Sequence, residues 1–157
     1  MDVGLYDRVQ QRLALSADSA QLSHGMLVLT LAAPELLATV QLLKTELTFD
    51  LLLDVTAVDW PQRPLRFDVV YHLYSTAHGV RIRLKTSVAE SDATVDTLTS
   101  LFGSARFLER ECHDMYGIAF RGNPDLRPLL LYEGFQGHPL RKDYPIDREQ
   151  PLVPYRS

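Results

Sequence analysis

Apolar residues recur at helical spacing in four stretches of the chain. In the first, Leu5, Val9 and Leu13 recur every fourth residue and form one apolar stripe. The stretches cover residues 5–13, 34–47, 92–102 and 107–117. In the fourth, Cys112 and Met115 lie on the apolar side of the segment ERECHDMY. We therefore predict four helices, each packing its apolar stripe against the rest of the molecule.

Other patterns predict strands between these helices. The run MLVLTL at residues 26–31 follows a turn at Gly25, and LLLDVTAV at residues 51–58 is apolar enough for a buried strand. In residues 67–74 and 80–85, apolar and polar side chains alternate, and the turn between them predicts an antiparallel hairpin. One face of this hairpin is apolar and the other is charged. The fold class that we expect is α+β, with a small, mostly antiparallel sheet covered by helices on one face.

Regular periodicity fades after Gly117. Four of the nine prolines fall at or after residue 139, and almost no apolar cluster accompanies them. Proline lacks the backbone donor that helices and sheets need, and a segment without apolar residues cannot bury a core of its own. We divide the chain into an α+β domain over residues 1–116 and an irregular, glycine- and proline-rich, partner-binding extension over residues 117–157. The proline-rich C-terminal tail is expected to be disordered alone or to lie extended on another protein.

Composition excludes several classes of function. A formal net charge of -4 lacks the basic footprint of a nucleic-acid binder. The first residues show no basic segment followed by an apolar run, so we expect no secretory signal and a cytoplasmic location. The most apolar window is interrupted by Pro34 and Glu35 and does not predict a membrane span. Cys112 is the single cysteine, so the chain cannot form an internal disulfide or hold an iron–sulfur cluster by itself.

The segment ERECHDMYGIAF, which begins at Glu109, concentrates the candidate chemistry. Cys112 and His113 cannot form a dyad with each other, because adjacent side chains on a helix diverge by about 100°. A cysteine at an apolar helical position is more often a core residue than a nucleophile. Glu109 and His113 are four residues apart and could offer two metal ligands, but two ligands do not make a site. An ion pair between Arg110 and Asp114 explains the charges without a metal.

Basic residues beyond this segment are candidates for charge recognition. The glycines that precede them do not form a nucleotide-binding pattern, and they favour tight backbone turns instead. Arg127, Arg141 and Lys142 are available for carboxylates, which guanidinium groups bind in a planar, two-pronged geometry. Taken singly, each of these residues is equally well explained as a solvated surface charge.

Two segments in this order resemble one known family. ERECHDMYGIAFRGNPDLRPLLL, followed by GFQGHPLRKDYP, is similar to the signature of the C subunit of NADH-quinone oxidoreductase (respiratory complex I), the 30 kDa subunit family. DVTAVDWPQRP and RFDVVYHLYS are also similar to the family's central strands. By resemblance, the positions that match the family motif and that we expect at a partner interface are Glu109, Arg110, Glu111, Asp114, Gly117, Asp125, Arg127, Gly137, His138, Pro139, Arg141, Lys142 and Asp143. Asn123 departs from the pattern, because the family usually carries histidine there, or sometimes lysine.

The resemblance implies a non-catalytic structural subunit in the peripheral arm of a proton-translocating NADH:quinone oxidoreductase. It implies that this chain holds no cofactor, and that FMN, iron–sulfur clusters and quinone belong to partner subunits that pass electrons from NADH to quinone. The expected partners are the quinone-site (D) subunit and neighbouring iron–sulfur subunits, at the cytoplasmic face of the cell membrane. Neither nucleic acid nor a membrane span in this chain is expected.

Two alternatives stay open. Related subunits occur in energy-converting hydrogenases and in ferredoxin- or coenzyme F420-dependent complexes, so the same scaffold role also fits a different electron donor. The other alternative is a free-standing enzyme that uses Cys112 as a nucleophile, or Glu109 and His113 as metal ligands.

Overall fold

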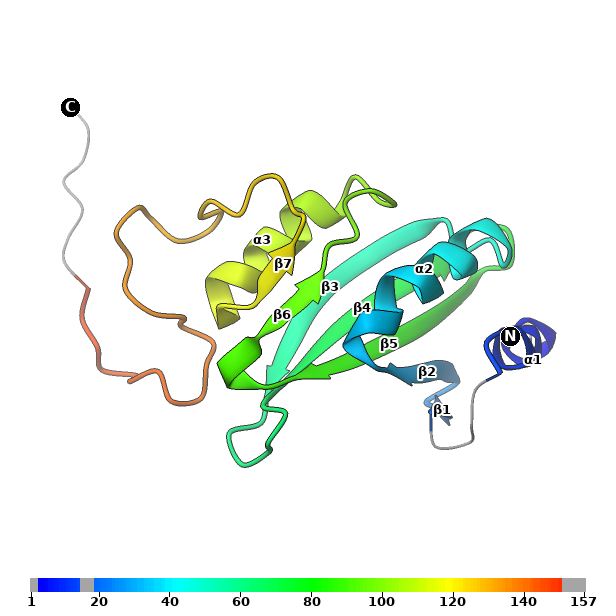
Figure 1. Cartoon of the computed structure of the whole chain (residues 1–157), viewed down its shortest axis with the longest axis horizontal. Coiled ribbons are helices and arrows are strands. Elements are labelled where there is room, and N and C mark those ends of the chain that lie inside the picture. Colours follow the sequence, from blue (N-terminus) through cyan, green and yellow to red (C-terminus); the bar gives the residue numbers. More distant parts are fainter. Residues whose placement is uncertain (1–2, 15–18, 151–157) are drawn as a thin grey trace.

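The computed structural model describes residues 3–14 and 19–150 and contains a five-stranded sheet with helices packed against it (Figure 1). The strands of this sheet are β1 (Ala20–Ser23), β2 (Met26–Leu31), β3 (Leu51–Asp59), β4 (Phe67–Ser75) and β5 (Val80–Val88). Their spatial order is β1-β2-β5-β4-β3, in which β2 and β5 are parallel and the other neighbouring pairs are antiparallel. The α+β class, the mostly antiparallel sheet and the hairpin are therefore confirmed.

Helices and a smaller sheet complete the described structure. The helical elements are α1 (Val3–Arg12), the 3-10 turn η1 (Ala33–Glu35), α2 (Leu36–Thr45), the 3-10 turn η2 (Glu90–Asp92) and α3 (Ala105–Tyr116). Two short strands, β6 (Thr94–Asp96) and β7 (Ala119–Arg121), form a separate parallel pair. α2 and α3 lie over the same face of the large sheet (Figure 1). Within the described parts of the chain, no helix has the length and apolarity needed to span a membrane.

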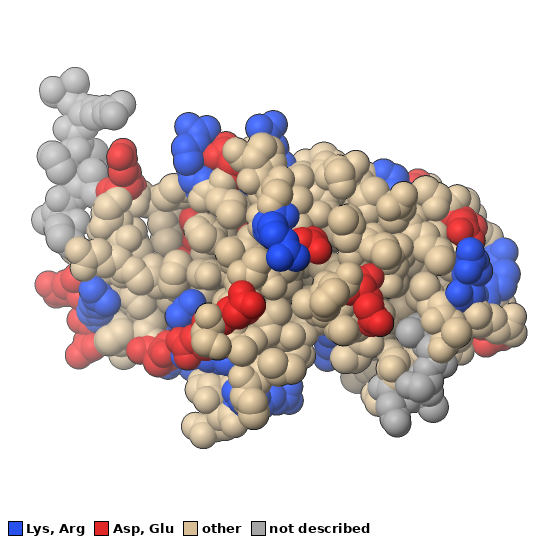
Figure 2. Space-filling model, viewed as in Figure 1, with Lys and Arg blue, Asp and Glu red and all other residues tan. Residues whose placement is uncertain are grey.

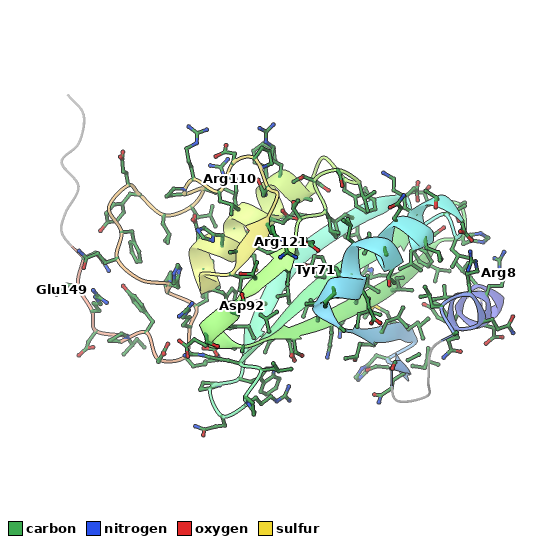
Figure 3. All side chains as sticks on the ribbon, in the orientation of Figure 1. Arg8, Tyr71, Asp92, Arg110, Arg121 and Glu149 are labelled. Atoms are coloured by element: carbon green, nitrogen blue, oxygen red, sulfur yellow. The ribbon has the colours of Figure 1, made fainter. Side chains whose placement is uncertain are left out.

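The two faces of the sheet differ as the alternation predicted. Tyr71 of β4, near the centre of the sheet in Figure 3, pairs with Leu84 of β5, and both are fully buried in the core under the helices. The next residues along these strands, His72 and Arg83, pair on the opposite face, where Arg83 Nε donates to His72 Nε2 over 2.9 Å. Because side chains alternate along a strand, one apolar face suffices to hold all the packed helices on one side.

The helix predicted over residues 92–102 is wrong. Residues 94–96 form β6, and the chain after it turns so that Leu98 O accepts the N–H groups of Leu101 and Phe102, each over 2.9 Å. Val95 of β6 pairs with Phe120 of β7, and both side chains are buried. The spacing of apolar residues in 92–102 is also compatible with a helix. The strand is preferred because β7 supplies hydrogen-bond partners that only the folded chain brings near.

The core continues past residue 116, where we placed the end of the domain. Ile118 and Phe120 are buried in the core, and β7 follows α3 directly. Residues 122–150 contain no helix or strand, yet they bond back to the domain instead of leaving it. The extended proline-rich tail is not confirmed, and its last residues, 151–157, lie outside the part of the chain that the structure describes.

Charges of both signs are mixed on the face seen in Figure 2, where Lys and Arg lie beside Asp and Glu. Ion pairs at the surface of the molecule include Arg12–Glu46 and Arg121–Asp96, each 2.7 Å apart. Exposed pairs of this kind contribute little to stability. The buried charges around α3 are of greater consequence.

Candidate partner interface at the end of helix α3

The placement of α3 on the sheet decides where each charge of the motif points. Ala105 and Cys112 face the core, as the spacing predicted for Cys112. Glu111 lies on the opposite side and is exposed. The helix ends at Gly117, which has φ 75° and whose N–H donates to His113 O over 2.7 Å. A left-handed glycine of this kind is a common helix terminator.

Glu109 is directed inward and is fully buried. Its Oε1 accepts the N–H of Leu98 over 2.7 Å, and its Oε2 accepts Thr97 Oγ1 over 2.6 Å and Asn123 Nδ2 over 2.9 Å. Burial raises the pKa of Glu109, while the three donors act to lower it. One carboxylate therefore ties α3 to the turn after β6 and to the loop after β7.

Arg110 holds the next part of that loop. It lies between α3 and the segment after β7 (Figure 3), and its guanidinium donates to Arg127 O over 2.9 Å and to Pro128 O over 2.8 Å. Its nearest carboxylate is Asp125, 3.7 Å away, and Asp125 also forms a two-pronged pair with Arg127, at 2.8 and 3.0 Å. The Arg127 guanidinium holds the pKa of Asp125 well below its usual range. The ion pair that we predicted between Arg110 and Asp114 does not form.

Asp114 has backbone partners instead. Its Oδ2 accepts the N–H groups of Leu129, Leu130 and Leu131, over 2.8, 2.8 and 3.2 Å. The residue is 4% exposed, so a carboxylate without these donors would be costly at this position. The three N–H groups converge on one oxygen, which fixes the path of a loop that has no helix or strand of its own.

The segment from His138 to Arg141 closes the end of α3. An α-helix leaves its last carbonyl groups without partners inside the helix. Here His138 Nδ1 donates to Asp114 O over 2.9 Å, Leu140 N to Met115 O over 3.1 Å, and Arg141 Nε to Tyr116 O over 2.7 Å. A cationic side chain at a helix C-terminus also complements the helix dipole. The predicted interface residues His138 and Arg141 are therefore bonded within the chain.

Glycine makes this close approach possible. A Cβ on Gly117 would collide with the ring of His138 and would lie 2.7 Å from Arg141 Nη2. Gly137, with φ 93°, turns the chain into this segment, and a Cβ there would lie 3.0 Å from the ring of Tyr144. Pro139 lies between His138 and Leu140 and is half-buried.

The last two predicted residues meet partners that the sequence analysis missed. Asp143 pairs with Arg66 over 2.8 Å, and the backbone N–H of Lys142 donates to Asp59 Oδ2 over 2.7 Å. The ammonium of Lys142 is exposed and has no ion pair within the described ranges. Asp59 and Arg66 stand at the facing ends of β3 and β4, and no local pattern in the sequence connects either of them with the extension.

The geometry gives little support to the two chemical alternatives, a nucleophilic Cys112 and a metal site at Glu109 and His113. Cys112 is 2% exposed, and burial raises the pKa of its thiol, as expected of a core residue and not of a nucleophile. His113 Nδ1 donates to Ile118 O over 2.8 Å, while Glu109 points to Leu98 and Thr97. Residues 3–14 and 19–150 hold no cluster of three or more His, Cys, Asp or Glu suited to a metal ion.

Comparison with known proteins agrees with the motif. Residues 29–150 match the model of the family described as "Respiratory-chain NADH dehydrogenase, 30 Kd subunit". The chain belongs to this 30 kDa subunit family. It is 47% identical to an NADH-quinone oxidoreductase C subunit of Rhizobium meliloti, over 87% of this chain and 68% of that protein. It is 38% identical to the NADH-quinone oxidoreductase C subunit of Geotalea uraniireducens, over 96% of this chain and 91% of that protein. The resemblance inferred from the sequence is thus confirmed.

Solved structures show the same fold. The trypsin-resistant fragment (1-134) of Nqo5 is 33% identical and superposes with a TM-score of 0.69, over 78% of this chain and 99% of the fragment. A chain of the membrane-bound sulfane sulfur reductase, an archaeal respiratory membrane complex, superposes with a TM-score of 0.77 over 91% of this chain and 85% of its own. That chain is only 24% identical, so it supports the fold alone.

Asn123 is the position at which the resemblance led us to expect histidine or lysine. Its Nδ2 donates to Glu109 over 2.9 Å, and its Oδ1 accepts the N–H of Asp125 over 2.9 Å. The side-chain amide supplies the donor that the buried carboxylate needs and also shapes the turn that follows. The departure therefore leaves the network around Glu109 complete.

We expect Glu109→Ala to lower the free energy of unfolding by about 1–3 kcal/mol, because the buried N–H of Leu98 loses its acceptor. Chemical denaturation measures the change. Glu111→Ala, on the exposed side of the same helix, should stay within about 0.5 kcal/mol of the wild type. Equal effects of the two substitutions would contradict the role assigned to Glu109.

Gly117→Ala should also be destabilising, by about 1–2 kcal/mol for the left-handed backbone alone, with a further cost for displacing His138 and Arg141. Thermal or chemical denaturation gives the result. Gly103→Ala is the matched control, since nothing lies within 4 Å of its added Cβ and its backbone is not left-handed. It should be neutral or stabilising by up to about 1 kcal/mol. A neutral Gly117→Ala would show that the extension does not pack there.

The thiol of Cys112 should react with a disulfide reagent only after unfolding, because it is buried and its pKa is raised. Absorbance of the released thiolate measures the reaction in native and urea-unfolded protein. Ser100→Cys, at an exposed position, provides a native-state positive control. Labelling of native wild-type protein as fast as that of the control would revive the nucleophile hypothesis.

Proposed function

We propose that this chain is a non-catalytic structural subunit of the peripheral arm of a proton-translocating NADH:quinone oxidoreductase, and that it docks against the quinone-site (D) subunit. The observation that carries this proposal is the use of the motif charges. Glu109, Arg110 and Asp114 point to the chain's own loops, and no two of them converge on a space where a substrate could react. The motif thus shapes a surface.

The outward side of that surface has the character of a contact site. Leu129 and Leu130, which follow Pro128, are 37% and 61% exposed, and Leu140 is 50% exposed. The loop that carries Leu129 and Leu130 is bonded to Asp114, and the segment that carries Leu140 is bonded to Met115, both in the last turn of α3. Patches of exposed apolar side chains mark protein interfaces, whereas scattered single ones do not. An adjoining subunit would bury them.

The electron path belongs to the partners in this proposal. FMN, iron–sulfur clusters and quinone lie in the other subunits, and this chain contributes no ligand to them. The relatives named as NADH-quinone oxidoreductase subunits support NADH as donor and quinone as acceptor. The assembly would sit at the cytoplasmic face of the membrane, with this subunit attached through its partners.

The test is an affinity purification of the tagged chain from its own cells in mild detergent, followed by mass spectrometry. We expect flavin- and cluster-bearing NADH-oxidising subunits together with the quinone-site subunit. Leu130→Asp should reduce their recovery about tenfold or more, which corresponds to a loss of about 1.4 kcal/mol in binding. Leu22→Asp, on β1 and 67% exposed, is the matched control and should leave recovery within about twofold of wild type.

Three results would contradict the proposal. Recovery of hydrogenase subunits would move the same scaffold role to a different electron donor. Recovery of the chain alone, in repeated gentle preparations, would remove the scaffold role. Equal recovery with Leu130→Asp and Leu22→Asp would show that docking uses another surface.

A further inference from the structure

Arg66 lies at the centre of a charge cluster at one end of the large sheet, in which Asp59 is buried and the side chains of Glu90 and Asp143 are 52% and 58% exposed. Arg66 is 7% exposed, and its guanidinium has five N–H donors. Nε and Nη2 donate to the two oxygens of Asp59, over 2.7 and 2.9 Å. Nη1 donates to Glu90 and to Asp143, each over 2.9 Å, and Nη2 also lies 2.8 Å from the second oxygen of Asp143. The guanidinium thus makes four hydrogen bonds to carboxylates and one further close charge contact.

The cluster joins parts of the chain that are far apart in sequence. Asp59 ends β3, Glu90 belongs to η2, and Asp143 lies in the extension, while Arg66 directly precedes β4. The Arg66 guanidinium lowers the pKa of both Asp59 and Asp143, which keeps them ionised at neutral pH. If Asp143 were lost, Arg66 would keep Asp59 and Glu90, but one Nη1 donor would lose its acceptor and Nη2 would lose a charge contact.

Neighbouring contacts add to this attachment. Arg141 Nη1 donates to Glu90 over 3.3 Å, and its guanidinium lies over the ring of Phe67 at 5.0 Å. The N–H of Lys142 donates to Asp59. Together with the bonds to the end of α3, these contacts attach His138 and each residue from Leu140 to Asp143 to the domain. This degree of internal bonding differs from what is expected of a tail that orders only on a partner.

Two side chains of the same segment are left pointing outward. Leu140 is 50% exposed although its N–H is bonded to Met115 O. Lys142 is exposed, and its ammonium has no carboxylate partner in the described part of the chain, although its N–H is bonded to Asp59. The backbone at both positions is therefore fixed while the side chains remain available. Leu129 and Leu130, on the other loop that bonds to the last turn of α3, are also exposed.

We propose that the cluster of Asp59, Arg66, Glu90 and Asp143 holds residues 138–144 in place before assembly, and that Leu140 and Lys142 form a preformed docking surface. The partner surface that fits it is an apolar groove with a carboxylate at its rim, which would receive Leu140 and pair with Lys142. A preformed segment avoids the ordering cost of folding on binding. The proposal rests on the proposed scaffold function for its partner, but the state of the free chain can be tested separately.

The first test is hydrogen exchange of the free, full-length chain, followed by mass spectrometry or NMR. We expect the amides of Leu140 and Lys142 to exchange at least about 100-fold more slowly than in an unstructured peptide. Asp143→Ala should reduce this protection about tenfold or more, without changing protection in β4 and β5. Asp147→Ala, which removes an exposed carboxylate three residues beyond this segment, should change it less than about twofold.

Two outcomes of this test would overturn the preformed surface. One is unprotected exchange at Leu140 and Lys142 in the free wild-type chain, which would show that the segment orders only on a partner. The other is full protection in Asp143→Ala, which would show that the cluster does not hold the segment. Neither outcome depends on which complex the chain joins, so neither would bear on the proposed function.

The second test measures the docking contact in the complex purified from the cells. Lys142→Glu should weaken association about tenfold at low salt and less at high salt, because the lost attraction is electrostatic. It should leave exchange at the Leu140 amide unchanged, since the backbone bonds remain. Lys85→Glu, on the uncovered face of the sheet, makes the same change of charge and should leave association unchanged. Equal weakening by both variants, or by neither, would refute the role of Lys142.

Discussion

The unpaired carbonyl groups at the end of α3 are the constraint on which the C-terminal part of the molecule depends. A helix cannot satisfy its own last carbonyls, and here His138, Leu140 and Arg141 supply the donors. Gly117 has no Cβ to keep that segment away. The end of one helix thus determines where a long stretch without secondary structure can lie.

Two buried carboxylates on the same helix extend this control. Glu109 and Asp114 each accept three hydrogen bonds, and the donors come mainly from loops. Burying a carboxylate is unfavourable unless such donors are present, so the loops cannot move away without a large cost. Buried charges of this kind add little net stability compared with apolar residues. Here they select one path for the loops among many.

This arrangement fits the proposed role of a subunit that contributes surface. Two charges of the 30 kDa family motif, Glu109 and Asp114, lie inside the fold, while Leu130 and Leu140 are exposed on the loops that bond to the same helix. The core between the sheet and its helices supplies a rigid base. The motif residues fix the loops at the end of α3 in one conformation. A partner could bind these loops without the cost of ordering them.

The sequence by itself determined the elements whose signal is local. Alternation in residues 67–74 and 80–85 predicted the hairpin and its buried face, and the spacing around Cys112 predicted α3 and its stop at Gly117. The motif also identified the family. These inferences succeed because the period of apolar residues and the special backbone of glycine act within a few residues.

Only the tertiary structure decided which distant groups meet. Residues 94–96 became a strand because β7 pairs with them, and Arg110 turned to the loop carbonyls because Asp114 is occupied by the N–H groups of Leu129, Leu130 and Leu131. Asp59, Arg66 and Glu90 gave no local sign that they would bind the extension. A hydrogen bond or ion pair across many residues depends on the path of the whole backbone, and no spacing along the chain encodes it.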